Sequence, residues 1–172
     1  SPDGQRLAVG KVDGTVQVWN AEFGCLVANL PAPFQGLRAV AFTTDGRRLL
    51  AGNFGQRSAV WEAGPPQSPK VIPVGPDAVW QVAFGGNGAW LATGGGDGAV
   101  RTWDAITGQR LLEVRGHAQV VHCLAVSPNS QNILSGSADR TVRLWDASSG
   151  QELHCFKGHR DCFPAGDGYG HG

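Results

Sequence analysis

The sequence predicts an all-β protein made of short antiparallel sheets that repeat along the chain. Four tryptophans follow one another at intervals of 42 residues: Trp19, Trp61, Trp103 and Trp145. Cutting the 172-residue chain at this interval, without gaps, gives rows that begin SPDGQRLAVG, TTDGRRLLAG, GGNGAWLATG and SPNSQNILSG. Charged residues make up only 16% of the chain and glycine occurs 26 times, which favours many strands joined by tight turns over long surface helices.

The last row shows how each unit is expected to fold. Four of its segments are short, apolar-rich and partly alternating, as strands are: residues 120–126, 132–137, 141–145 and 152–156. The turn-forming stretches SPNS, ADR and DASSG separate them, so each unit is predicted to be a four-stranded antiparallel meander. The outermost strand of the second unit is expected to be weak or irregular, because prolines cannot donate to a strand ladder and several fall there: Pro65, Pro66, Pro69 and Pro73.

This repeat resembles the WD40 family. The resemblance is carried by Gly-His and Trp-Asp pairs and by the segments DGTVQVW and DRTVRLW; the pairs are Gly116-His117, Gly158-His159, Trp103-Asp104 and Trp145-Asp146. The interval fits the roughly 40–45 residues of this repeat. The resemblance covers residues 1–163 and implies that the units are blades of a β-propeller, each with an inner strand near a central channel and an outer strand at the rim.

The resemblance also implies an incomplete ring of about four blades. Residues 1–163 form the repeat region, with units at about 1–30, 31–73, 74–115 and 116–157 and the start of a fifth at 158–163, followed by an irregular tail at 164–172. The first unit lacks its innermost strand, and CFPAGDG is too rich in proline and glycine to form the next one. The opening SPDG and the lack of methionine favour a longer natural protein that supplies further blades. The alternative is self-association, in which a second copy completes the ring.

The resemblance further implies a buried hydrogen-bonded tetrad in each unit. Only the fourth unit has all four residues: His117, Ser137, Asp139 and Trp145. Ser137 is expected to join His117 to the indole of Trp145, and Asp139 to accept from His117. His117, Ser137 and Asp139 also have the residue types of a hydrolytic triad. However, the chain has no G-x-S-x-G motif, and related residues recur in other units, which favours architecture. We therefore predict no enzymatic activity, no catalytic residues and no cofactor.

Other features argue against particular classes of site and partner. One segment holds the residue types of zinc ligands, but their order fits neither usual pairing, so no metal is predicted: His154, Cys155, His159 and Cys162. The 14 basic residues balance the 14 acidic ones and neither sign forms a run, which argues against nucleic-acid and membrane partners. The lack of N-x-[ST] sequons and of a disulfide framework favours the cytoplasm.

A partner-binding surface is expected where large side chains interrupt the repeat. Arg38, Trp80 and His122 share one column near the start of the inner strand, and Phe54 lies just before the column of turn aspartates. Aromatic residues and arginine are enriched at interface hot spots. The alternative for these residues is irregular packing in the second and third units.

The function expected is a non-enzymatic interaction scaffold, part of a larger propeller that binds a protein or peptide on its top face, where the aspartate turns emerge. The alternative is a regulatory or sensor module fused to an enzyme, such as a protein kinase, that lies outside this sequence.

Overall fold

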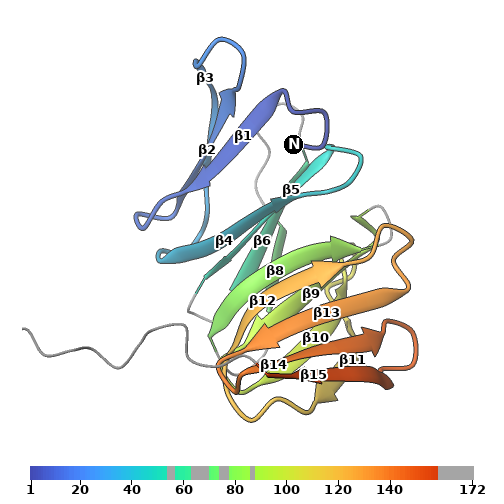
Figure 1. Ribbon diagram of the computed structural model, residues 1–172. Coiled ribbons are helices and arrows are strands. Elements are labelled where there is room, and N and C mark those ends of the chain that lie inside the picture. The colour runs from blue at the N-terminus through green and yellow to red at the C-terminus, as the bar shows by residue number, and fades with distance from the viewer. Residues whose placement is uncertain (54–56, 63–69, 74–77, 86–87, 159–172) are drawn as a thin grey trace, which may run out of the picture.

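The computed structural model describes residues 1–53, 57–62, 70–73, 78–85 and 88–158. Within these residues the secondary structure consists of strands β1 to β15, arranged in four antiparallel sheets (Figure 1). The all-β prediction is therefore confirmed. Over the same residues, no helix has the length and apolar character needed to cross a lipid bilayer.

Each sheet is a meander whose strands pair in chain order. The first sheet has three strands: β1 (Arg6–Gly10), β2 (Thr15–Asn20) and β3 (Leu26–Pro31). The second has four: β4 (Leu37–Phe42), β5 (Arg48–Asn53), β6 (Arg57–Glu62) and β7 (Lys70–Pro73). The third comprises β8 (Val79–Gly85), β9 (Trp90–Gly95), β10 (Ala99–Asp104) and β11 (Arg110–Arg115). The fourth comprises β12 (Val121–Val126), β13 (Asn132–Ser137), β14 (Thr141–Asp146) and β15 (Glu152–Lys157).

This strand count agrees with the repeat read from the sequence. Four-stranded meanders form in the last three units, and the first sheet lacks the innermost strand, as predicted. The outermost strand of the second sheet, β7, has only 4 residues, in keeping with the prolines around it. The expected start of a fifth unit and the tail, from residue 159 onward, lie outside the described residues.

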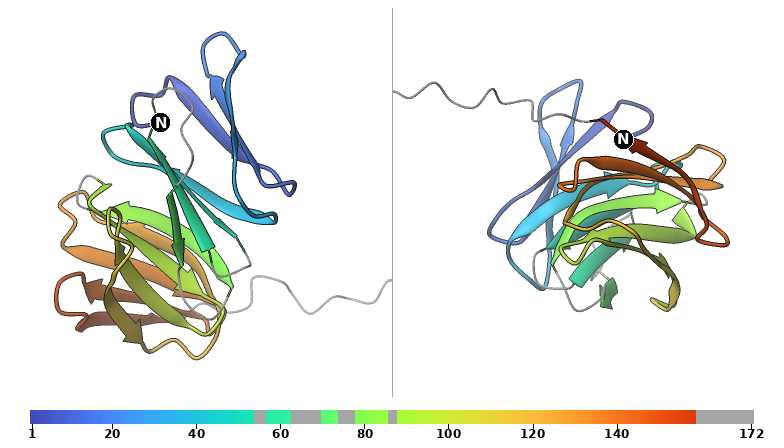
Figure 2. Two further views of the ribbon diagram at one scale, coloured as in Figure 1. Left: turned by 180° about the vertical axis from the view of Figure 1, so that it is seen from behind. Right: turned by 60° about the horizontal axis from the view of Figure 1, so that its bottom comes forward.

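The sheets fan out from their inner strands. Strand β8 lies between β4 and β12, and the sheets follow one another from blue to red around these three strands (Figures 1 and 2). The described sheets form an open arc rather than a closed ring. The arrangement is that of consecutive propeller blades, so we refer to the sheets as blades one to four.

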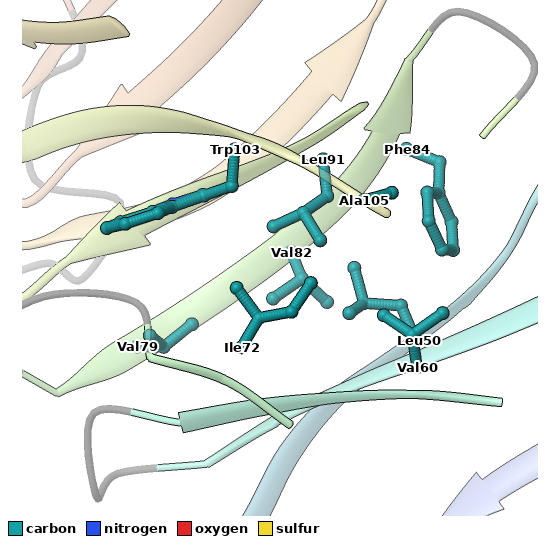
Figure 3. Packing of buried hydrophobic residues seen from close by; sticks show 9 residues of the cluster. All are labelled: Leu50, Val60, Ile72, Val79, Val82, Phe84, Leu91, Trp103 and Ala105. Atoms are coloured by element: carbon teal, nitrogen blue, oxygen red, sulfur yellow. The ribbon is translucent and has the colours of Figure 1, made fainter. Parts of the chain in front are cut away.

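Apolar side chains from facing sheets fill each boundary between blades. Between blades two and three, Leu50, Val60 and Ile72 lie on one side, and the side chains of Leu91 and Trp103 lie on the other (Figure 3). Burying a side chain of this size contributes roughly 1.5–3 kcal/mol. The same columns recur at the other two boundaries, so the repeat tryptophans Trp61, Trp103 and Trp145 are each buried at a boundary.

The two ends of the arc expose apolar columns that are buried inside it. Leu7 of blade one is 57% exposed, whereas Leu49 and Leu91, in the same column, are 1% and 0% exposed. At the other end Phe156 is 52% exposed, and Ile72 in its column is 0% exposed. These side chains are exposed because no blade among the described residues packs against them. In the other blades the same columns are buried.

Candidate functional site

Blade four contains a buried hydrogen-bonded relay, but its serine is Ser135 and not the predicted Ser137. The indole of Trp145 donates from Nε1 to Ser135 Oγ at 2.8 Å. Ser135 Oγ lies 2.8 Å from Nε2 of His117, and Nδ1 of that ring lies 2.9 Å from Asp139 Oδ2. With Nδ1 protonated, tryptophan donates to serine, serine to histidine and histidine to aspartate, so every buried polar group in the relay is satisfied.

Ser137 has a separate role in the turn that follows. Its hydroxyl donates to the carbonyl oxygen of Gln119 at 3.0 Å and accepts from the amide of Asp139 at 3.1 Å. Both ring nitrogens of His117 are engaged within the relay, so His117 is not placed to take a proton from Ser137. Ser135, His117 and Asp139 do share the hydrogen-bond order of a hydrolytic triad, but Ser135 is 0% exposed and its hydroxyl also accepts from Trp145, so the relay does not present this serine to a substrate.

The prediction of Ser137 is wrong because two serines share a face of the strand. Side chains two residues apart on a strand point to the same side, so spacing alone does not distinguish Ser135 from Ser137. Trp145 pairs across the ladder with Ile133, and its indole reaches the next side chain on that face, which is Ser135. Ser137 lies two residues farther along, at the end of β13.

Asp139 is the anionic end of the relay. Its carboxylate also accepts from the amide of Ala118 at 2.9 Å and from the amide and hydroxyl of Thr141 at 2.9 Å and 2.7 Å. Partial burial opposes ionisation, but these hydrogen bonds and the one from His117 outweigh it and hold the pKa of Asp139 well below its ordinary value. The carboxylate therefore stays charged at neutral pH and links the β13–β14 turn to the segment that enters β12.

Blade three keeps the tryptophan–hydroxyl bond of the relay. Trp103 Nε1 donates to Thr93 Oγ1 at 3.0 Å. Thr93 occupies the column of Ser135, so the two blades satisfy the buried indole in the same way. The sequence prediction, which placed the hydroxyl in the column of Ser137, therefore missed this bond.

The aspartate turn of blade three is held by an arginine. Arg101 is 3% exposed and donates to both carboxylate oxygens of Asp97, at 3.2 Å and 2.5 Å, and to Glu113 at 3.1 Å. A Cβ atom on Gly95 would lie only 2.4 Å from Asp97 Oδ1, so this glycine makes room for the ion pair. Burial opposes ionisation of Asp97, but the bonds from Arg101 prevail and hold its pKa below the ordinary value.

Blade two lacks the acceptor for its tryptophan. Trp61 is 2% exposed, and its Nε1 has no hydrogen-bond partner among the residues that the structure describes. The residue in the column of Thr93 and Ser135 is Ala51, which is fully buried. A buried donor left without an acceptor costs about 1–3 kcal/mol, so blade two carries a defect that blades three and four avoid.

We expect Ala51→Ser to raise the free energy of unfolding by about 1 kcal/mol, because the new hydroxyl would accept from Trp61 Nε1. Urea denaturation measures the change, and slower exchange of the Trp61 indole proton would report the new bond. Ala92→Ser is the matched control: Ala92 is also fully buried but lies in the column of Leu50, so its hydroxyl should destabilise. Equal destabilisation by both substitutions would contradict the assignment.

Three of the four predicted surface residues lie together on the inner strands. The guanidinium carbon of Arg38 lies 5.3 Å from the ring centroid of Trp80. The ring centroids of Trp80 and His122 are 5.2 Å apart, with an angle of 85° between the ring planes. Arg38 and His122 are exposed and Trp80 is half-buried. We call Arg38, Trp80 and His122 the Arg–Trp–His row.

The row exists because the same backbone irregularity occurs in three blades. The pairing of each inner strand with its neighbour skips one residue, as at a β-bulge, and the skipped residues are Arg38, Trp80 and His122. A bulge takes a residue out of the ladder and re-aims its side chain. The bulge also occurs in blade four, which keeps the full relay, so irregular packing in blades two and three does not account for the row.

Trp80 lies over the turn that carries Asp97. A Cβ atom on Gly96 would lie 3.5 Å from Trp80 Nε1, and the Gly96 amide donates to the carbonyl of Ala78 at 3.0 Å. The row therefore lies at the edge of the sheets where the aspartate turns emerge, which we call the Asp-turn face. The fourth predicted residue, Phe54, lies outside the described residues.

Comparison with known proteins identifies the repeat. The family described as WD domain, G-beta repeat matches residues 1–20, 68–104 and 108–146, which together exceed half of the chain. The unmatched residues 21–67 include most of blade two, where Ala51 replaces the hydroxyl of the relay. No curated protein sequence matches the chain. Repeats of this family generally serve as protein-interaction scaffolds and are generally not catalytic. The three matched segments of the chain and its meander blades show that it belongs to the WD40 repeat family.

Proposed function

We propose that the chain is a non-enzymatic interaction scaffold that binds a protein or peptide segment at the Arg–Trp–His row. The observation that carries the proposal is the bulge repeated at Arg38, Trp80 and His122, because it costs ladder pairing in three blades and directs three polar or aromatic side chains to one place. Aromatic and arginine side chains are the types that dominate the energy of protein interfaces.

The row favours a segment with a carboxylate next to an apolar side chain. Arg38 offers a guanidinium that forms paired hydrogen bonds with carboxylates, and Trp80 offers apolar area beside it. His122 adds a ring nitrogen at the other side of the indole. An acidic residue followed by an aliphatic or aromatic one would use all three groups.

We further propose that residues 1–163 form the repeat region of a larger propeller. The apolar columns exposed at both ends of the arc support this proposal, because the same columns are buried at each internal boundary. The repeat units read from the sequence, with a fifth beginning at 158–163, remain part of the proposal.

Trp80→Ala is expected to weaken peptide binding by at least tenfold, because truncating a central interface aromatic typically costs about 2 kcal/mol or more. The probe is a 12-residue peptide selected from a displayed library against the 172-residue chain, and fluorescence anisotropy gives its dissociation constant. Phe23→Ala is the matched control, since Phe23 is an aromatic residue that is 74% exposed and lies away from the inner strands. Equal binding by wild-type protein and Trp80→Ala, or selection of peptides without acidic residues, would count against the proposal.

A further inference from the structure

Two arginines tie neighbouring blades together on the face opposite the Asp-turn face. Arg6 donates from Nη2 to the carbonyl oxygen of Gly46 at 2.7 Å, and Arg48 donates from Nη1 to that of Gly88 at 3.0 Å. The two arginines share a column of the repeat, and so do the two glycines. At the first two blade boundaries, a guanidinium of one blade therefore crosses to the first turn of the next.

Each crossing guanidinium has a second partner. The guanidinium carbon of Arg6 lies 5.4 Å from the ring centroid of Phe42, within the range of a cation–π interaction. Arg48 donates from Nε to the carboxylate of Glu62 at 2.8 Å. The fold therefore holds a guanidinium with an aromatic ring at one boundary and with a carboxylate at the next.

At the third boundary the arginine column holds Trp90, which cannot supply a guanidinium. A Cβ atom on Gly85 would lie 2.1 Å from Cζ2 of Trp90, so the indole covers the backbone of its own blade at this point. A hollow of about 600 Å³ opens beside it, and its lining includes Trp90, Asn132, Asp146 and Ser148. The hollow is an indentation between blades three and four, at the place where the preceding boundaries hold an arginine.

Asp146 gives the hollow a negative charge. Its Oδ1 accepts from the amides of Ser148 and Ser149, at 3.0 Å and 2.8 Å, and from both hydroxyls, at 2.6 Å and 2.9 Å. These hydrogen bonds hold the pKa of Asp146 well below its ordinary value, so the carboxylate is ionised at neutral pH. Among the described residues, the lining includes no lysine or arginine to neutralise it.

We propose that this hollow binds an arginine side chain presented by a partner protein. The guanidinium would lie against the ring of Trp90 and near the carboxylate of Asp146, which reproduces in one site the aromatic partner of Arg6 and the carboxylate partner of Arg48. A guanidinium is attracted both to an indole face and to a carboxylate. The site lies on the face opposite the Arg–Trp–His row, so it is independent of the function proposed above.

Titration of the full chain with Nα-acetyl-arginine N-methylamide, a probe for an arginine within a polypeptide, tests the proposal. Backbone amide signals of Asn132 and Ser148 in NMR spectra should shift and saturate. The citrulline analogue has the same shape without the charge and should bind at least tenfold more weakly. Equal binding of the two probes, or no saturable shift with the arginine probe, would overturn the proposal. Binding of free arginine but not of the capped probe would show that the hollow takes the free amino acid and not an arginine residue of a protein, and would overturn the proposal.

Two variants locate the binding in this hollow. Trp90→Arg restores the arginine of the first two boundaries, so it should abolish probe binding and raise the midpoint of thermal unfolding. Asp146→Asn keeps the acceptor oxygen of the turn but removes the charge, and should weaken binding at least tenfold. Asp104→Asn changes the equivalent turn of blade three, where the carboxylate accepts from the amides of Ile106 and Thr107, and should leave binding unchanged. Wild-type affinity in both Trp90→Arg and Asp146→Asn would place the probe elsewhere and refute the site.

Discussion

Replacing Ser135 with alanine is expected to lower the free energy of unfolding by about 2–4 kcal/mol, because it leaves two buried polar groups unsatisfied at once. The hydroxyl accepts from Trp145 Nε1 and bonds Nε2 of His117, and both side chains are buried. Water does not replace the lost partner easily, because Ser135 itself is 0% exposed. Urea denaturation followed by tryptophan fluorescence measures the loss.

Two further substitutions separate the relay from the turn beside it. Ser137→Ala removes bonds of a residue that is only half-buried, so we expect a loss of about 1 kcal/mol or less. Ser135→Thr keeps the hydroxyl in the form that blade three already uses at Thr93, and should retain most of the stability. A larger loss of unfolding free energy for Ser137→Ala than for Ser135→Ala would show that the relay hydroxyl belongs to Ser137, the residue predicted from the sequence.

The strands and their order could be predicted because they depend on patterns that recur in every unit. A column that is leucine or isoleucine in four copies indicates a face that packs against a neighbouring blade, and the intervening turns are set by residues such as glycine and asparagine. The residue types of the relay followed from the family. The choice between Ser135 and Ser137 depended on how far the Trp145 indole reaches across the ladder, which spacing does not encode.

One sequence signal would have identified the relay serine. The column of Ser135 contains Thr93, a second hydroxyl, whereas the column of Ser137 contains Gly95. A hydroxyl in both well-formed blades is the pattern that a shared acceptor for the tryptophan indole requires. In blade three the aspartate turn is held by the ion pair of Arg101 and Asp97 instead of by the full relay. The sequence gives no comparable signal for this ion pair, because the buried arginine takes one partner from a turn and the other from a strand.

The Arg–Trp–His row was predictable as a column but not as a contact. Arg38, Trp80 and His122 were expected near one another because they occupy the same position in neighbouring blades. The bulges that set their side chains against each other are irregularities of the backbone, and the three residues at the bulge have no chemistry in common that would indicate one.

Gly98→Ala is expected to lower the free energy of unfolding by about 2–5 kcal/mol, because two separate costs fall on one methyl group. The glycine has a φ of 75°, in the left-handed region, where a Cβ atom is strained. The added Cβ would also lie 2.6 Å from the carbonyl oxygen of His117 and 3.0 Å from that of Gln119, both on the segment that enters blade four. The substitution should therefore disturb the boundary between blades three and four as well as its own turn, and thermal or urea unfolding measures the loss.

Gly108→Ala isolates the conformational cost from the steric one. Gly108 has a nearly equal φ of 77°, but among the described residues a Cβ atom there would meet Ile72 alone, at 3.8 Å, which is ordinary van der Waals contact. We expect it to cost about 1 kcal/mol. The repeat supports this separation, since Arg140 occupies the column of Gly98 in blade four with a φ of 67°, where the described residues include no further blade to press on it. Equal losses for the two alanine variants would show that the turn conformation alone, and not the approach of the next blade, requires glycine at this position.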